Sequence, residues 1–246
     1  MPATGVVLVS EQSADGTERS KVLNLYAGIG GNRKLWENVD VVAVEINPDI
    51  AAYYAEQFPE DEVVVGDAHE YLLEHYDEFD FVWSSVPCQT HSKVSRMMWD
   101  SDADHNENRE PEYPDMRLYQ EILFLKHFAN CDWAVENVQS YYEPLIEPQR
   151  VGRHYIWSNF HVPPYEHDHS PGAWTNPSNE VFEEHLGFDL SGVQFEGARK
   201  DQVLRNCVDP ELGKHVLDAA FETRQTTLVA ATDGGNSRGA DTGTDQ

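Results

Sequence analysis

A cysteine and a glutamate end two predicted strands, where both could act on one substrate. Cys88 lies on a proline-stiffened turn after a strand predicted over 79–83, and Glu136 ends a strand predicted over 133–136. A free cysteine is usually a small buried hydrophobe, and a lone glutamate at a strand end can simply face solvent. However, the four residues after Cys88 are polar, which favours an accessible thiol. Since parallel strands end at one edge of a sheet, we expect a nucleophilic thiol and a carboxyl group at one site.

A glycine-rich turn suits a nucleotide-like ligand at the same edge. The segment 26–32 reads Tyr-Ala-Gly-Ile-Gly-Gly-Asn and joins a strand predicted over 22–25 to a helix predicted over 31–38. Such a turn lets backbone N–H groups approach a ligand, although a purely structural turn uses the same residues. Arg33 stands where the dinucleotide fingerprint has its last glycine, which disfavours a nicotinamide.

Two acids follow the next strands and point to adenosine. Glu45 ends a strand predicted over 41–46, where a carboxylate can accept both ribose hydroxyls. Asp67 follows a strand predicted over 63–65, where it can accept an exocyclic amine. The dipeptide Asn47-Pro48 is expected to begin a helix and to have no contact with the ligand.

These strands alternate with helices, which predicts an α/β fold with a doubly wound, mostly parallel sheet. Further helices are expected over 48–57, 116–128, 181–186 and 210–221, the last of them packing back on the sheet. We divide the chain into a disordered tail (1–20), a catalytic cofactor-binding domain (21–160), a small loop-rich insertion (161–204), a return to the catalytic domain (205–224) and a second disordered tail (225–246).

The composition is strongly acidic, with 17 basic and 44 acidic residues and a net charge of −27. The acids are dispersed, which indicates a halophilic protein more than an acidic interaction tail. We find no apolar run long enough for a membrane span and no signal peptide, so the protein is expected in the cytoplasm. Three distant cysteines argue against disulfides and thiolate zinc, and solvated histidines explain His161, His167 and His169 better than a metal does.

The ordered set of motifs resembles the DNA cytosine-5 methyltransferase family. The resemblance spans roughly 21–160 and returns at 205–221, and its most specific part is the pair Pro87-Cys88-Gln89 and Glu136-Asn137-Val138 downstream of the glycine turn. It implies the S-adenosylmethionine-dependent methyltransferase fold, with S-adenosyl-L-methionine as cofactor. The residues that it implies around the cofactor are Tyr26, Ala27, Gly28, Gly30, Gly31, Glu45, Ile46, Asp67, Pro87 and Asn206.

The resemblance also implies the chemistry and three catalytic residues. Cys88 would attack C6 of a flipped cytosine in DNA, and Glu136 would hold its N3 and amino edge. Arg153 would hold O2 and lower the pKa of Cys88. Two departures from the family pattern stand out: Val151 replaces the first arginine of the family's Gln-x-Arg-x-Arg segment, and Arg205 replaces the glycine before Asn206.

The substrate remains open at this point. The insertion 161–204 lies where the family places its target-recognition region, with contact candidates Trp174, Asn176, Asn179, Arg199 and Lys200, and the segment 92–117 is either a lid or a solvated loop. Motifs alone do not exclude an RNA substrate such as tRNA. Two alternative interpretations are a catalytically silent nucleic-acid-binding protein and an exocyclic amine methyltransferase. The presence of Cys88 and Glu136 argues against the first, and the turn after the strand 79–83, which reads Val-Pro-Cys-Gln, differs from the turn that the second requires. A restriction endonuclease is a possible partner.

Overall fold

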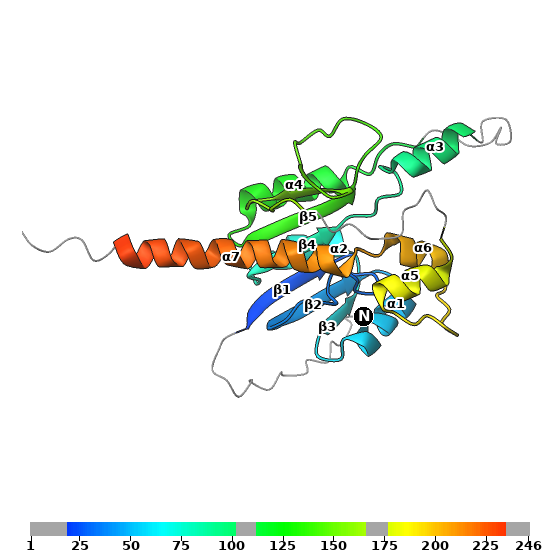
Figure 1. Ribbon diagram of the computed structural model, residues 1–246, viewed down its shortest axis with the longest axis horizontal. Helices are drawn as coiled ribbons and strands as arrows, with labels where there is room; N and C mark the ends of the chain where they lie inside the picture. Colours follow the sequence, from blue (N-terminus) through cyan, green and yellow to red (C-terminus); the bar gives the residue numbers. More distant parts are fainter. Residues whose placement is uncertain (1–18, 102–111, 166–176, 235–246) are drawn as a thin grey trace, which may run out of the picture.

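The protein contains one seven-stranded sheet in the order β3-β2-β1-β4-β5-β7-β6 (Figure 1). This computed structural model describes residues 19–101, 112–165 and 177–234, with backbone alone for 98–101 and 224–234. Neighbouring strands from β3 to β5 are parallel, whereas β7 is antiparallel to both β5 and β6. The strands are β1 (Ser20–Leu25), β2 (Val39–Glu45), β3 (Glu62–Val65), β4 (Phe81–Ser85), β5 (Asp132–Val138), β6 (Gln149–Val151) and β7 (His154–Ser158). The predicted mostly parallel α/β sheet is confirmed, and β6 and β7 are added to it.

Helices cover both faces of the sheet, as its continuous apolar strands require. On one face, α7 packs Leu212 and Val216 against Trp83 of β4. On the other face, α2 and α4 pack against strand residues that include Val82. The helices are α1 (Pro48–Gln57), α2 (Ala68–His75), α3 (Lys93–Ser101), α4 (Arg117–Phe128), α5 (Asn179–Leu186), α6 (Lys200–Asn206) and α7 (Pro210–Gly234).

The prediction of a helix over 31–38 is wrong. The chain makes successive turns there, with backbone bonds from Lys34 N–H to the Gly31 carbonyl and from Trp36 N–H to the Arg33 carbonyl, three residues back. Asn38 then takes a left-handed φ of 57° and begins the approach to β2. Tertiary contacts decide the path of this segment, since Gly31 packs closely against Cys207 and Val208 and Arg33 bonds to Asp61.

The predicted boundary of the second tail is also wrong, because α7 continues ten residues past 224, to Gly234. The stretch 225–233 contains neither proline nor glycine, so nothing in it stops a helix that is already nucleated on the sheet. The first tail and the segment 235–246 lie almost wholly outside the described residues.

The segment 177–206 packs on the glycine turn and on α1. Phe182, Leu186 and Leu204 share one core cluster with Ile29 of the turn and Tyr53 of α1. Within the described part, the predicted insertion is therefore joined to the catalytic domain by a common core. The contact candidates Trp174 and Asn176 lie outside the described residues, as does 102–111 of the segment 92–117, which was predicted to be either a lid or a solvated loop.

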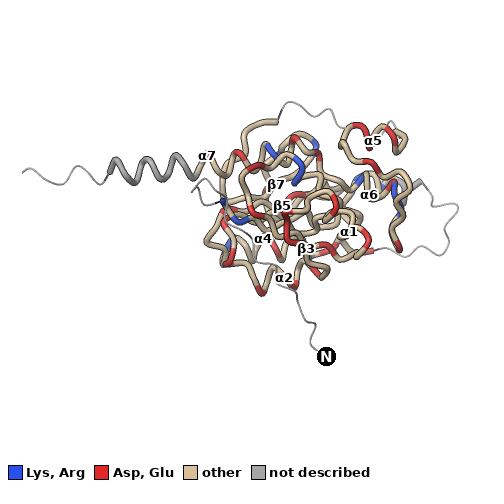
Figure 2. The backbone as a smooth tube through the Cα atoms, turned by 90° about the horizontal axis from the view of Figure 1, so that it is seen from below, with Lys and Arg blue, Asp and Glu red and all other residues tan. Residues whose placement is uncertain are grey.

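Acidic residues occupy most of the elements visible in Figure 2, while lysine and arginine are fewer and scattered. This distribution matches the dispersed acids of the sequence. Over residues 19–101, 112–165 and 177–234, no helix has the length and apolar character needed to cross a membrane.

Candidate active site

The glycine turn forms the floor of a cavity of about 400 Å³ at the carboxyl edge of the sheet. Gly28 has a φ of 54°, and a Cβ at this residue would meet no atom within 4 Å, so the backbone faces open space. Gly31 is required for another reason, since a Cβ there would clash with the Val208 carbonyl and the Cys207 sulfur. The turn thus combines a ligand-facing glycine with one that permits close packing.

Gly30 does not line the cavity. It has a φ of 87° and the Phe58 ring lies against it, so it serves the conformation of the turn. The other nine residues predicted around the cofactor all line the cavity. Glycines at such short spacing are indistinguishable in sequence, and only the packing separates their tasks.

Glu45 places its carboxylate at the end of β2, over the glycine turn. Oε2 accepts the Gly28 N–H at 3.0 Å and Oε1 accepts the Asn47 N–H at 2.9 Å. Each oxygen keeps a lone pair for a further donor, as a ribose hydroxyl would require. Asn47 caps α1, with Pro48 in its first turn, in agreement with the predicted helix start. Asn47 also lines the cavity, which differs from the expectation that this dipeptide lies away from the ligand.

Asp67 caps α2 and is less available than the sequence suggested. Its Oδ1 accepts the N–H groups of His69 and Glu70, and its Oδ2 accepts Arg117 at 3.1 Å. Burial raises the pKa of Asp67, but the two N–H groups and the Arg117 guanidinium outweigh that effect, and the net shift is downward. The carboxylate remains charged at the cavity wall, where it can still accept an amine proton on a remaining lone pair.

A buried network behind Tyr26 was not found from the sequence. Glu121 of α4 has no exposed surface and accepts hydrogen bonds from Tyr26 at 2.5 Å and from Ser84 at 2.6 Å. His69 Nδ1 lies 3.0 Å from the same carboxylate. Because Tyr26 lines the cavity at a φ of 56°, Glu121 holds a strained residue of the site in place. A glutamate on the apolar face of the predicted helix 116–128 was the only available signal.

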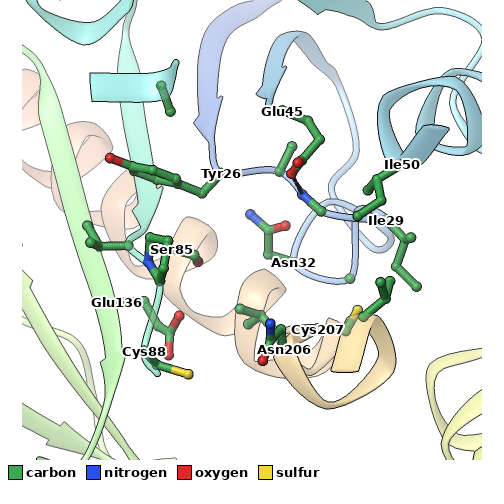
Figure 3. A pocket seen from close by; sticks show the side chains of 18 of the residues that line it. Tyr26, Ile29, Asn32, Glu45, Ile50, Ser85, Cys88, Glu136, Asn206 and Cys207 are labelled. Carbon is green, nitrogen blue, oxygen red and sulfur yellow. Dashed lines mark hydrogen bonds between the residues drawn. The ribbon is translucent and has the colours of Figure 1, made fainter. Parts of the chain in front are cut away.

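Cys88 and Glu136 meet at the opposite end of the cavity from Glu45 (Figure 3). The turn that carries Cys88 is tied to β5, because the Asn137 side chain donates to the Val86 carbonyl at 2.9 Å. Burial and the charge of Glu136 raise the pKa of the Cys88 thiol to about 11. The thiol is therefore mostly protonated at neutral pH, contrary to the expectation that its pKa would be lowered.

Arg153 does not line the cavity, and His154 does. Gly152 and Arg153 form the turn between β6 and β7, where Arg153 is exposed. His154, the first residue of β7, places Nδ1 2.6 Å from Oε1 of Glu136. Arg153 was predicted at the site and His154 was not, because the register of the hairpin, which local sequence does not reveal, decides which side chain turns inward.

The junction of α6 and α7 closes the far wall of the cavity, with Asn206 and Cys207 facing the glycine turn (Figure 3). The Val208 carbonyl lies against Gly31 of that turn. The open space at Gly28 and the acceptors Glu45 and Asp67 at one end fit the adenosine part of S-adenosyl-L-methionine. Cys88 and Glu136 at the other end leave room for a second substrate. In the part of the chain that the structure describes, no group of three or more histidine, cysteine or acidic side chains could hold a metal ion.

Residues 20–108 match the family model of C-5 cytosine-specific DNA methylase. The chain has the fold of S-adenosylmethionine-dependent methyltransferases. The match covers about a third of the chain and includes the glycine turn, Glu45, Asp67 and Cys88, but it ends before Glu136. The place of Glu136 in the site therefore rests on the geometry.

Solved structures with similar folds are distant. A mutant of Spodoptera frugiperda DNMT2 is 23% identical with a TM-score of 0.34 and covers 48% of this chain and 35% of its own. A TehB-like SAM-dependent methyltransferase from Corynebacterium glutamicum is 18% identical with a TM-score of 0.32, covering 50% and 57%. A SAM-dependent methyltransferase from Agrobacterium tumefaciens is 11% identical with a TM-score of 0.34, covering 52% and 41%. No curated protein matches the sequence.

Proposed function

We propose that this protein transfers a methyl group from S-adenosyl-L-methionine to C5 of cytosine in DNA. One observation carries the proposal: a thiol and a carboxyl group, Cys88 and Glu136, face each other at one end of a cavity whose other end suits adenosine. The family match over residues 20–108 supports it, because the matched segment contains Cys88.

The cofactor supplies an electrophilic methyl group on a sulfonium sulfur. Glu45 would accept the ribose hydroxyls, Asp67 would accept the adenine amine, and Gly28 would let the ligand lie against the backbone. Cys207 and Val208 pack closely against Gly31 on the other side of the turn. A cofactor held in this way would have room to extend toward the end of the cavity where Cys88 lies.

Cys88 and Glu136 act on the base. The Cys88 thiol gives its proton to the Glu136 carboxylate, and the resulting thiolate adds to C6 of cytosine. The C5–C6 double bond breaks, and the electron pair moves toward N3, which takes the proton from the Glu136 carboxyl group. C5 would then be nucleophilic and could accept the methyl group that S-adenosyl-L-methionine, held by Glu45 and Asp67, would supply. A base then removes the C5 proton, the Cys88–C6 bond breaks to release the thiolate, and N3 returns its proton.

The target base must leave its stack to reach Cys88, because the thiol lies inside the cavity. A net charge of −27 does not provide the broad basic field that carries most nonspecific DNA binding. We infer that binding depends on base extrusion, stacking and hydrogen bonding, and that it operates in high salt, where such a field is screened for any protein.

The test is methyl transfer from labelled S-adenosyl-L-methionine to unmethylated duplex DNA in molar potassium chloride, with tRNA as a second substrate. We expect label at C5 of cytosine in DNA, lost in Cys88→Ala. Cys131→Ala is the matched control, because Cys131 is buried in the core and does not line the cavity. Label in tRNA alone would transfer the proposal to RNA, and label in neither would overturn it.

A further inference from the structure

The hairpin of β6 and β7 places two adjacent basic side chains on different sides of the site. Val151 pairs with His154 across the hairpin, so Gly152 and Arg153 form the turn. His154 also pairs with Val138 of β5, and Glu136 lies two residues earlier on the same face of that strand. The register thus directs His154 toward Glu136 and leaves Arg153 exposed.

The contact between His154 and Glu136 is short and shielded from water. Nδ1 lies 2.6 Å from Oε1, and the side chains are 17% and 7% exposed. A hydrogen bond of this length between a ring nitrogen and a carboxylate is charge-assisted. Because His154 engages Oε1, the other carboxyl oxygen, Oε2, is left for a substrate.

The other charged and titratable groups around this contact come from several elements. Cys88 follows β4, Arg150 and Arg153 belong to the hairpin, and Arg205 of α6 lines the cavity. Arg150 lies over the Tyr155 ring, 5.7 Å from its centroid to the guanidinium carbon. Of these groups, Cys88 is the one whose pKa the charge of Glu136 raises.

We infer that His154, and not Arg153, is the positioning residue that balances the charge of Glu136 beside Cys88. This inference deepens the proposed function and rests on it for the identity of the base. The hydrogen bond from His154 Nδ1 to Oε1 offsets part of the negative charge that opposes thiolate formation. It also keeps a proton on the pair, so that Glu136 can protonate N3 when Cys88 adds to C6 and can regain that proton when the adduct breaks down.

The test measures the alkylation rate of each cysteine in the folded protein by iodoacetamide and peptide mass spectrometry at several pH values. In His154→Gln the charge of Glu136 is no longer balanced, so we expect Cys88 to react about tenfold more slowly at neutral pH. In Glu136→Gln the opposing charge is gone, so we expect faster reaction. Alkylation needs neither cofactor nor DNA, which separates a failure of this inference from a failure of the proposed function.

Two further variants sharpen the comparison. His75→Gln is a matched control, because His75 makes a similar contact with Glu78, at 2.8 Å, outside the cavity. Its Cys88 should react like that of the wild type. Arg153→Gln tests the neighbouring cation, and an effect on Cys88 as large as that of His154→Gln would overturn the inference.

A double variant decides whether His154 acts through Glu136. In the Glu136→Gln background, adding His154→Gln should change the Cys88 rate by less than about twofold, since the partner is already gone. If His154→Gln slowed Cys88 alkylation by the same factor with Glu136 and with Gln at that position, the inference would be overturned. Circular dichroism identifies any variant that fails to fold. If His154→Gln does not fold, Glu136→Gln still tests the pair, because removal of the Glu136 charge should increase the alkylation rate of Cys88. An unchanged rate in Glu136→Gln would overturn the inference.

The kinetic constants of methyl transfer provide the readout that a merely structural role would not separate. His154→Gln should lose about 100-fold in kcat, with an unchanged KM for S-adenosyl-L-methionine, because His154 contacts Glu136 and not the acceptors Glu45 and Asp67 at the other end of the cavity. A kcat like that of the wild type, or a KM that changes as much as kcat, would contradict the assignment.

Discussion

The hydroxyl group of Tyr26 donates a hydrogen bond of 2.5 Å to Oε1 of Glu121, a carboxylate with no exposed surface. Tyr26 is the first residue after β1 and lines the cavity, while Glu121 comes from α4 on one face of the sheet. Ser84 of β4 and His69 of α2 contact the same carboxylate. One buried group therefore joins four elements behind the candidate cofactor site.

Removing the Tyr26 hydroxyl should loosen the cofactor site. In Tyr26→Phe the ring remains but loses its bond to a charged acceptor, a loss of about 1.5–3 kcal/mol that we expect to divide between the free energy of unfolding and cofactor affinity. Isothermal titration with S-adenosyl-L-methionine and urea unfolding measure the two effects. Tyr141→Phe, at a half-exposed tyrosine outside the cavity, is the control, and equal behaviour of the two variants would contradict the role assigned to Glu121.

The contact of His69 with Glu121 predicts a pH-dependent stability. The hydrogen bond to Glu121 raises the pKa of His69 above its ordinary value of 6.5, and burial opposes this only in part. A raised pKa in the folded protein means that the protonated ring stabilises the fold below pH 6.5 and that this contribution is lost as the pH rises through the folded value. As the pH rises through that range, the free energy of urea unfolding should decrease in the wild type and decrease less in His69→Gln. Parallel curves for the two proteins would refute this prediction.

Gly31→Ala should disrupt the glycine turn. The added methyl group would clash with the backbone carbonyl of Val208, which cannot move without shifting the start of α7. Overpacking of this kind costs roughly 1–3 kcal/mol, and we expect cofactor affinity to fall with stability. Thermal unfolding and cofactor titration give the result. Gly66→Ala is the matched control, since an added Cβ at Gly66 would lie 4.0 Å from the nearest atom. A Gly31→Ala variant with the stability and cofactor affinity of the wild type would contradict the prediction, because it would mean that the Val208 backbone can move to accept the methyl group.

Arg33 occupies the position where a dinucleotide-binding turn has its last glycine, and it anchors the turn to the loop after α1. Arg33 Nε donates to Oδ2 of Asp61 at 2.8 Å, and Nη2 donates to Oδ1 at 2.9 Å. The Asp61 side chain is 2% exposed. Asp61→Asn should destabilise the protein by about 3 kcal/mol, because it leaves a nearly buried guanidinium without its counter-charge.

The control for this pair is Arg19→Gln, at a surface arginine 3.5 Å from Asp40, which should change the free energy of unfolding by less than about 1 kcal/mol. Both variants are compared by urea unfolding at one salt concentration. Similar values for the two would mean that the Arg33 pair is screened like a surface pair.

The amino-acid sequence by itself determined the type of sheet and most of the residues that form the candidate site. The apolar runs alternate with helical segments, which leaves a parallel sheet with both faces covered as the solution that buries them. Glu45, Asp67, Cys88 and Glu136 follow or end its strands, and the carboxyl ends of parallel strands converge at one edge. Their approach to one cavity therefore follows from order along the chain, without knowledge of any contact.

Tertiary structure decided what local patterns leave open. The choice between Arg153 and His154 depends on the register of a hairpin, where a shift of one residue exchanges the inward and outward faces. Gly30 and Gly31 differ in backbone conformation and in what packs against them, and Glu121 gains its role from three partners on other elements. Each of these outcomes arises from contacts between residues distant in sequence, and such contacts form only when the sheet brings its helices and loops together.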